Sequence, residues 1–186
     1  LLRHRRRPHL DRLRLRRALP VGLLPGGAPA GRGGADERDP PAQGDLEGAL
    51  DLLDEAEILF MGDFSPNVRP ISALKARAWV RQGELEKALD WARERKLSIE
   101  EEPGYLREFE QIAFARILLL QYQSDKSINL LQNAVGFLER LLKAAKEGGR
   151  IGSVIEILIL KALAYQALSD IHDALLPLEQ ALTLAE

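Results

Sequence analysis

The sequence predicts an all-α fold, a right-handed superhelix built from antiparallel helical hairpins. A pattern of turn, acidic residue, hydrophobe and Ala-Leu recurs, as QGDLEGAL at residues 43–50, QGELEKAL at 82–89 and LSDIHDAL at 168–175. Apolar residues return at steps of three and four, the spacing of one helix face. Aromatic residues make up only 5% of the chain, while the strong helix formers Leu, Ala, Glu, Arg and Lys dominate. Because internal repeats of this kind indicate stacked hairpins, we expect a helical solenoid.

The composition excludes several classes of protein. The chain of 186 residues has no cysteine, so it forms neither a disulfide framework nor a thiolate metal site. No apolar run reaches the ~20 residues that a membrane-spanning helix needs. The arginine-rich start lacks the apolar core and the small residues of a secretory signal. We therefore expect a cytoplasmic protein without membrane contact.

Residues 1–43 differ sharply from the rest of the chain. They contain ten Arg, four acidic residues and no Lys, together with six of the ten Pro and six of the 15 Gly. Their net charge is +6, against −8 for residues 44–186, where nine Arg and seven Lys occur. So much Pro and Gly prevents long helices. We therefore divide the chain into residues 1–43, a disordered or non-native segment, and residues 44–186, the helical-repeat domain.

Three interpretations of residues 1–43 stay open. Arg, Pro, Gly and Ala all have GC-rich codons, so an out-of-frame reading or a wrong start site explains the mixture. A genuine disordered tail also fits, because large apolar groups are few. A nucleic-acid-binding arm is the third interpretation, since arginines bind phosphates, but no aromatic residue is interleaved with them for base stacking.

Caps, breakers and apolar periodicity place the helices of the repeat domain. Asp45 is positioned to cap a first helix whose apolar stripe covers residues 46–56. Further hairpins are expected at residues 71–82 with 85–92, 105–122 with 128–146, and 153–168 with 170–185. In the first of these, Leu74, Ala78 and Trp79 are expected to pack inward. The first helix is expected to be the second half of a hairpin and the last to lack a capping helix, so the domain is expected to be incomplete at both ends.

Small alanines set the repeat length. Ala49, Ala88, Ala134 and Ala174 stand 39, 46 and 40 residues apart. The repeat is therefore about 40 residues, longer than the ~34 of a tetratricopeptide repeat but built alike. Alanine is expected at these positions because two helices cross there too closely for a larger side chain.

No constellation in the sequence indicates catalysis, a cofactor or a metal. His4, His9 and His172 are too scattered for a metal site, and His172 is expected at the surface. GGRIGS at residues 148–153 opens a helix as phosphate-binding loops do. No strand precedes it and no Lys follows it in position, which favours a turn between hairpins. The three Glu at residues 100–102 favour a solvated loop over a cation site.

Binding is expected in the groove lined by the first helix of each hairpin. The hairpin register directs three arginines, one glutamate and one glutamine towards this groove: Arg77, Arg81, Arg116, Glu156 and Gln166. The arginines would steer an anionic ligand or an acidic peptide into it. The alternative for each residue is an ordinary solvated position on a helix face.

Five stretches of the repeat domain carry a family resemblance. They are QGDLEGAL at residues 43–50, DFSPNVRP at 63–70, WARER at 91–95, YLREFE at 105–110 and GGRIGSVIE at 148–156. Residues 43–186 closely resemble the helical-repeat region of the MalT-like family, the large ATP-binding transcription regulators of the LuxR type. Generic tetratricopeptide repeats share the Ala-Leu cores but not these connectors.

The resemblance implies a non-catalytic, tetratricopeptide-like solenoid that receives an inducer small molecule or a regulatory protein in its groove. In the family, a nucleotide-binding domain precedes this solenoid and a DNA-binding helix-turn-helix follows it. The sequence has no Gly-x-x-x-x-Gly-Lys-Ser/Thr loop and no helix-turn-helix, so ATP and DNA are expected only through flanking domains. The alternative is a free-standing tetratricopeptide-type adaptor that binds a peptide or partner protein.

Overall fold

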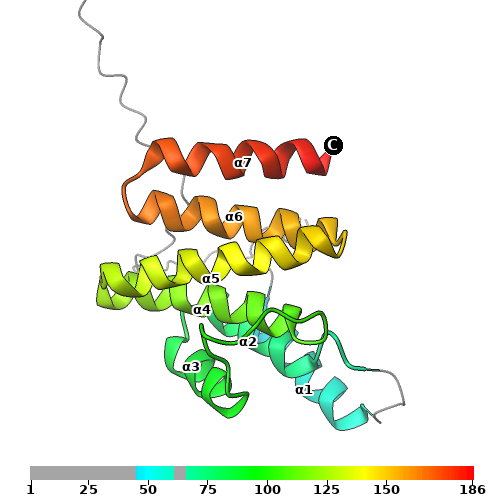
Figure 1. The fold of residues 1–186 in the computed structure, drawn as a ribbon. Coiled ribbons are helices and arrows are strands. Elements are labelled where there is room, and N and C mark those ends of the chain that lie inside the picture. Colours follow the sequence, from blue (N-terminus) through cyan, green and yellow to red (C-terminus); the bar gives the residue numbers. More distant parts are fainter. Residues whose placement is uncertain (1–44, 61–65) are drawn as a thin grey trace, which may run out of the picture. The chain divides into compact units, whose positions relative to one another are not determined.

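The helices expected from the sequence are all present in the part of the chain that the structure describes. The structure, a computed structural model, describes residues 45–60 and 66–186. Residues 1–43, and the interpretations offered for them, lie outside these ranges. The described residues form seven helices and no strand, which confirms the all-α fold (Figure 1): α1 (Leu46–Leu59), α2 (Ile71–Gln82), α3 (Leu85–Glu94), α4 (Glu108–Asp125), α5 (Ile128–Glu147), α6 (Ile151–Ala167) and α7 (Ile171–Ala185). The handedness and the repeat length stay predictions.

Local capping determines where the helices begin and end. Asp45 caps α1, because its Oδ1 accepts a hydrogen bond of 2.8 Å from the Gly48 N–H. Ser127 and Asp170 cap α5 and α7 in the same way. Gly83 ends α2 with a φ of 79°, in the left-handed region that glycine adopts without strain. The predicted break between α2 and α3 therefore has a backbone cause.

The helices pack as three hairpins with one additional helix. The hairpins are α2 with α3, α4 with α5 and α6 with α7, and α1 packs against α2. Contacts between hairpins run from α3 to α4 and from α5 to α6. The first helices of the hairpins also touch one another, α2 with α4 and α4 with α6. Side chains from α2, α4 and α6 are thereby brought to one side of the stack.

The core lies mainly between α3, α4, α5 and α6. Phe114 of α4 and Phe137 of α5 meet edge to face, with ring centroids 6.0 Å apart and an interplanar angle of 71°. Ala88 and Ala134 are fully buried, as the alanine pattern predicts. The other two alanines of that pattern differ, since Ala49 is exposed and Ala174 only half-buried.

The packing face of α2 differs from the prediction in one residue. Ala73, Ala76 and Ala78 are its buried residues, whereas the side chain of Leu74, predicted to pack inward, is 37% exposed. Ala73 and Ala76 share the face of α2 that enters the core, where small side chains let neighbouring helices approach closely. Leu74 and Ala78, four residues apart, share the face that turns towards α1. The placement of Leu74 in the core was therefore wrong.

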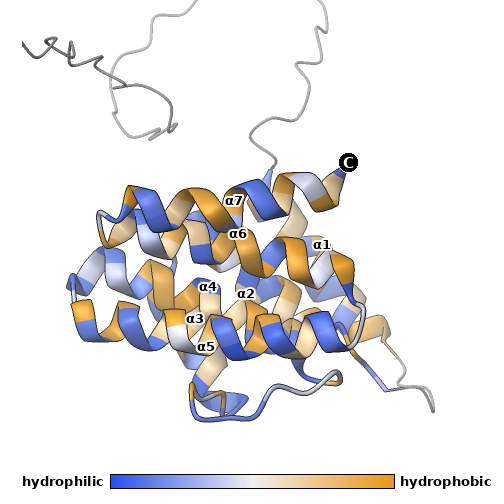
Figure 2. Cartoon of the chain, turned by 45° about the horizontal axis from the view of Figure 1, so that its top comes forward, coloured by the Kyte–Doolittle hydropathy of each residue, from blue (hydrophilic) through white to orange (hydrophobic). Residues whose placement is uncertain are grey.

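Helix α7 exposes much of its apolar side. Leu175 is 51% exposed and Leu182 is 60% exposed, and Figure 2 shows hydrophobic residues recurring along α6 and α7. The expected uncovered apolar surface on the last helix is therefore present.

Candidate functional site

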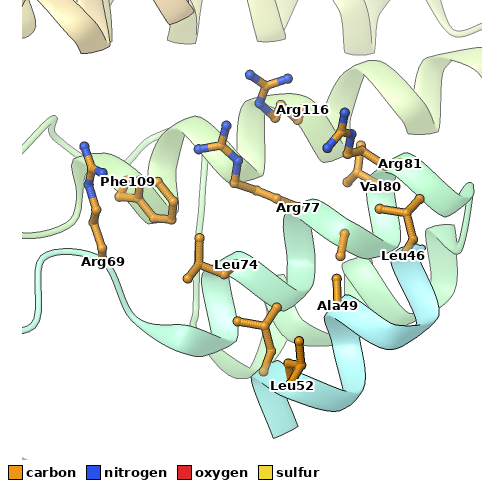
Figure 3. A pocket seen from close by; sticks show the side chains of 12 residues that line it. Leu46, Ala49, Leu52, Arg69, Leu74, Arg77, Val80, Arg81, Phe109 and Arg116 are labelled. Carbon is orange, nitrogen blue, oxygen red and sulfur yellow. The ribbon is translucent and has the colours of Figure 1, made fainter. Parts of the chain in front are cut away.

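A hollow of about 820 Å³ lies between α1, α2 and α4 (Figure 3). Eight of its twelve lining residues are apolar and the other four are arginines. In Figure 3 the guanidinium groups stand on one side of the hollow, while Ala49, Leu52 and Leu74 lie on the other. The arginines come from the connector before α2, from α2 and from α4: Arg69, Arg77, Arg81 and Arg116. The hollow therefore combines a cationic wall with an apolar one.

Helix α1 forms the apolar wall because its hydrophobic stripe is only partly covered by α2. Leu46, Ala49 and Leu53 share one face of the helix and line the hollow. No residue of α1 is buried, and Leu52 is 67% exposed. Within the described ranges, α2 is the helix against which α1 packs. The leucines of α1 thus face an open space that a ligand can fill.

Lys75 fastens α1 to α2 at the edge of this wall. Its Nζ lies 2.5 Å from Oδ1 of Asp54 and also pairs with Glu57. Burial lowers the pKa of Lys75, but the hydrogen bonds and negative charges of the two carboxylates outweigh it, so the net pKa lies above the ordinary lysine value. The ammonium group is therefore charged at neutral pH and holds α1 in place.

One carboxylate joins α2, α4 and α6, the first helices of the three hairpins. Glu156 of α6 accepts hydrogen bonds of 3.1 and 2.9 Å from Nε and Nη2 of Arg116 in α4. Nη2 of Arg77, in α2, lies 3.0 Å from the same oxygen, Oε1. Two guanidinium groups thus share one carboxylate, and one positive charge is left over.

The electrostatic environment of the hollow is positive. The pKa of Arg77 is lowered, first by burial; Glu156 opposes this shift, but the charges of Arg116, Arg69 and Arg81 add to it. No carboxylate in the described part of the chain lies within ion-pair distance of Arg81. An anion that entered the hollow would therefore relieve repulsion among these arginines.

Phe109 covers one end of the hollow and is itself covered by arginines. The guanidinium carbon of Arg77 lies 5.0 Å from the centre of the Phe109 ring, and that of Arg69 lies 5.6 Å from it. Phe109 is only half-buried and belongs to the first turn of α4. Cation–π contacts thus help to hold both arginines in position, and Arg77 is also held by its ion pair with Glu156.

The sequence-predicted groove residues fall into two places. Arg77, Arg81 and Arg116 line the hollow, and Glu156 pairs with two of them. Gln166 lies apart, in a separate hollow of about 350 Å³ between α6 and α7, where the other lining residues are apolar. The structure therefore brings four of the five residues together and leaves Gln166 out.

Sequence reasoning missed several lining residues. Arg69 precedes Pro70 in a connector, and no helical periodicity places a connector residue on a face. Phe109 falls within the helix expected at residues 105–122, but its periodicity alone gives it no role in the groove. The leucines of α1 were expected to form an ordinary core stripe. A charged residue next to the helix-opening Pro70 was the one available signal for Arg69.

The loop GGRIGS at residues 148–153 is a turn between hairpins that binds a carboxylate of the chain itself. Arg150 Nε donates a hydrogen bond of 2.7 Å to Oε2 of Glu108, and the Ser153 hydroxyl donates one of 2.5 Å to Oε1. Arg150 also donates to the Ala144 carbonyl at 2.8 Å. The side chains of Arg150 and Ser153 are therefore engaged by Glu108.

The acidic connector before α4 is held by its own neighbours. Gln111, which is fully buried, donates a hydrogen bond of 3.1 Å to the Glu102 carbonyl and accepts one of 3.4 Å from the Gly104 N–H. Glu101 pairs with Arg107 at 3.1 Å, so it is not simply solvated. In residues 45–60 and 66–186, no group of three or more His, Cys, Asp or Glu is placed to hold a metal ion.

Comparison with known proteins gives the family of the chain. None of the helices in the described ranges is long and apolar enough to cross a membrane. Neither the curated proteins nor the solved structures gave a match. The family described as the MalT-like TPR region matches residues 41–186, which include all seven helices and every residue of the hollow. The chain therefore belongs to the family of MalT-like tetratricopeptide-repeat regions.

Proposed function

We propose that this chain is the sensing segment of a bacterial MalT-like transcription regulator of the LuxR type, acting in the cytoplasm without catalysis. An effector, either an inducer small molecule or a regulatory protein, binds in the hollow between α1, α2 and α4. The observation that carries the proposal is the hollow itself, because a partly exposed apolar stripe of α1 lines one side of it and a cluster of arginines lines the other. Membership of the family supports the regulatory context.

The absence of cysteine makes a direct test available. A single thiol introduced by Ala49→Cys carries an environment-sensitive fluorophore on the wall of the hollow. The matched control is Asn133→Cys, at an exposed position of α5. Neutral oligosaccharides, small organic anions and acidic peptides form the test panel. We expect at least one of these classes to change the A49C signal saturably and to leave the N133C signal unchanged.

The outcomes decide between the proposal and its rivals. No saturable response to any class at A49C would contradict binding in the hollow. A response to peptides alone, in a gene without neighbouring frames for a nucleotide-binding domain and a helix-turn-helix, would favour a free-standing adaptor. Such neighbouring frames would instead support the regulator.

A further inference from the structure

We infer that the effector of this hollow is an amphipathic organic anion, a carboxylate on an unbranched aliphatic chain such as a medium-chain fatty acid. The inference rests on the proposed function and names the chemical class of its ligand. The carboxylate is bound by Arg77, Arg81 and Arg116, and the aliphatic chain lies along α1. Three observations lead to this class: the charge, the apolar wall and the size of the hollow.

The charge of the site requires an anion. Arg77 and Arg116 share the single oxygen Oε1 of Glu156, and Arg81 has no carboxylate partner among the described residues. Each guanidinium group has five N–H donors, and a carboxylate matches two of them at once. Arg77 and Arg116 are half-buried and Arg81 is exposed, so a bound anion would add a partner to all three, whereas a neutral ligand would leave their repulsion to solvent screening alone.

The apolar wall requires a hydrophobic body. The stripe of α1 that faces the hollow is only partly covered by α2, since Leu46 and Leu53 are half-buried. Two further leucines of the lining, Leu52 of α1 and Leu74 of α2, are 67% and 37% exposed. Covering such side chains contributes ~25 cal/mol per Å² of apolar surface removed from water. An inorganic anion or a short acid would leave that surface wet.

The volume of the hollow and the contacts of Phe109 narrow the class of ligand further. About 820 Å³ lies within the ~300–1,000 Å³ typical of small-ligand sites. Arg69 and Arg77 occupy the positions from which an aromatic ligand would stack on Phe109. A nucleotide or aromatic acid therefore gains no stacking surface, whereas an aliphatic chain needs none.

Glu156 competes with the ligand for the same arginines. An incoming carboxylate must displace Oε1 of Glu156 from Arg77 or Arg116, or share those groups with it. Removing the negative charge of Glu156 without shortening the side chain, by Glu156→Gln, is therefore expected to tighten ligand binding. A misfolded variant would not bind the ligand more tightly. A gain in affinity in this variant therefore shows that Glu156 competes for the arginines and does not merely support the fold.

The experiment measures binding of decanoate to the full chain carrying the A49C label, below the concentration at which decanoate forms micelles. Decanamide is the uncharged analogue, butyrate keeps the charge without the tail, and decylamine reverses the charge. We expect decanoate to bind about tenfold or more tighter than each of the three. A charge-assisted hydrogen bond contributes enough for that ratio against decanamide and decylamine, and the apolar surface of the longer chain contributes enough against butyrate. The N133C label should not respond to decanoate.

Variants then locate the binding groups. Arg81→Gln should weaken decanoate binding about tenfold, and E156Q should strengthen it several-fold. Leu52→Ser should weaken decanoate but not butyrate. Arg93→Gln is the control, because Arg93 is an exposed arginine of α3 paired with Asp90 and does not line the hollow. Circular dichroism checks that each variant is folded.

Failure of this inference is distinguishable from failure of the proposed function. Equal binding of decanoate and decanamide, or binding of an oligosaccharide or an acidic peptide with no response to decanoate, would overturn the ligand class while leaving a site in the hollow. If the A49C signal changed with no member of the panel, both the ligand class and the proposed function would be overturned. Weaker decanoate binding in E156Q would show that Glu156 orients the arginines and would also overturn the inference.

Discussion

Arg150 donates a hydrogen bond of 2.7 Å from Nε to Oε2 of Glu108, and so ties the start of α6 to the first turn of α4 across 42 residues of sequence. The Glu108 side chain is only 9% exposed. The rest of its carboxylate is satisfied by the Ser153 hydroxyl. A buried charge with these partners is a point at which two hairpins are fastened together, and it gives the first prediction.

Arg150→Ala should lower the free energy of unfolding by about 2–4 kcal/mol, because it leaves the Glu108 carboxylate buried without its cation. This loss of stability is smaller than for a fully buried ion pair, because the Arg150 side chain is 23% exposed. Urea unfolding measures the effect. Arg93→Ala, which breaks the exposed pair with Asp90, should cost about 0–1 kcal/mol. Equal losses in the two variants would show that the Glu108 contact does not fasten the hairpins.

Glu156→Ala should destabilise the chain in a salt-dependent way. Arg77 and Arg116 would then face each other without the shared carboxylate, and their repulsion is screened at high ionic strength. We expect a lower melting temperature than in the unmodified chain at low salt, and a smaller difference near ~1 M salt. Thermal melting followed by circular dichroism checks this. A difference that does not change with salt would mean that lost packing, and not charge, is responsible.

Ala88→Leu should cost about 1–3 kcal/mol of stability through overpacking. Ala88 is fully buried in α3, so the added methyl groups displace neighbours. Glu86→Leu places the same side chain at an exposed position of the same helix and should have little effect. Urea unfolding of the two variants compares them, and a neutral A88L would indicate that the hairpins do not cross closely at this position.

Gln111→Leu should open the acidic connector between α3 and α4. The side-chain amide of Gln111 holds the backbone of Glu102 and Gly104, and losing two hydrogen bonds is expected to raise the open population about tenfold or more. A glutamate-specific protease should then cleave at residues 100–102 correspondingly faster. Gln123→Leu, at an exposed position of α4, is the control. Unchanged cleavage in Q111L would show that other contacts hold the connector.

Alkaline pH should loosen α1. Because the pKa of Lys75 is raised in the folded chain above its ordinary value of 10.5, the stabilisation it provides is complete below that value and is lost as pH rises through the folded pKa. A fluorophore on α1, carried by A49C, should report the loosening. Lys75→Gln removes this titration, so the difference between the two proteins isolates Lys75 from other groups that ionise in the same range. Identical pH profiles would contradict the role of its ion pairs with Asp54 and Glu57.

The helices could be predicted from sequence because their signals are local. The Asp45 cap, the Gly83 stop and the apolar period act within a few residues of where they stand, so boundaries such as Ile71 and Gln82 agree with the structure. The candidate site was predictable only in part. Arg77, Arg81 and Arg116 could be assigned to one side from helix register, but which groups they meet depends on how separate helices approach.

The helices, their pairing into hairpins and the family of the chain could be inferred from the sequence alone, because capping, periodicity and connector motifs are properties of short segments. The burial of Glu108 and Glu110 became visible only in the folded chain, because their charges are balanced by Arg150 and Arg95, which no local pattern connects to them. The folded chain also shows that α1 leaves its leucines facing an open hollow. That outcome follows from the packing of whole helices, where the alanine face of α2 brings α3 and α4 close and Leu74 turns towards α1.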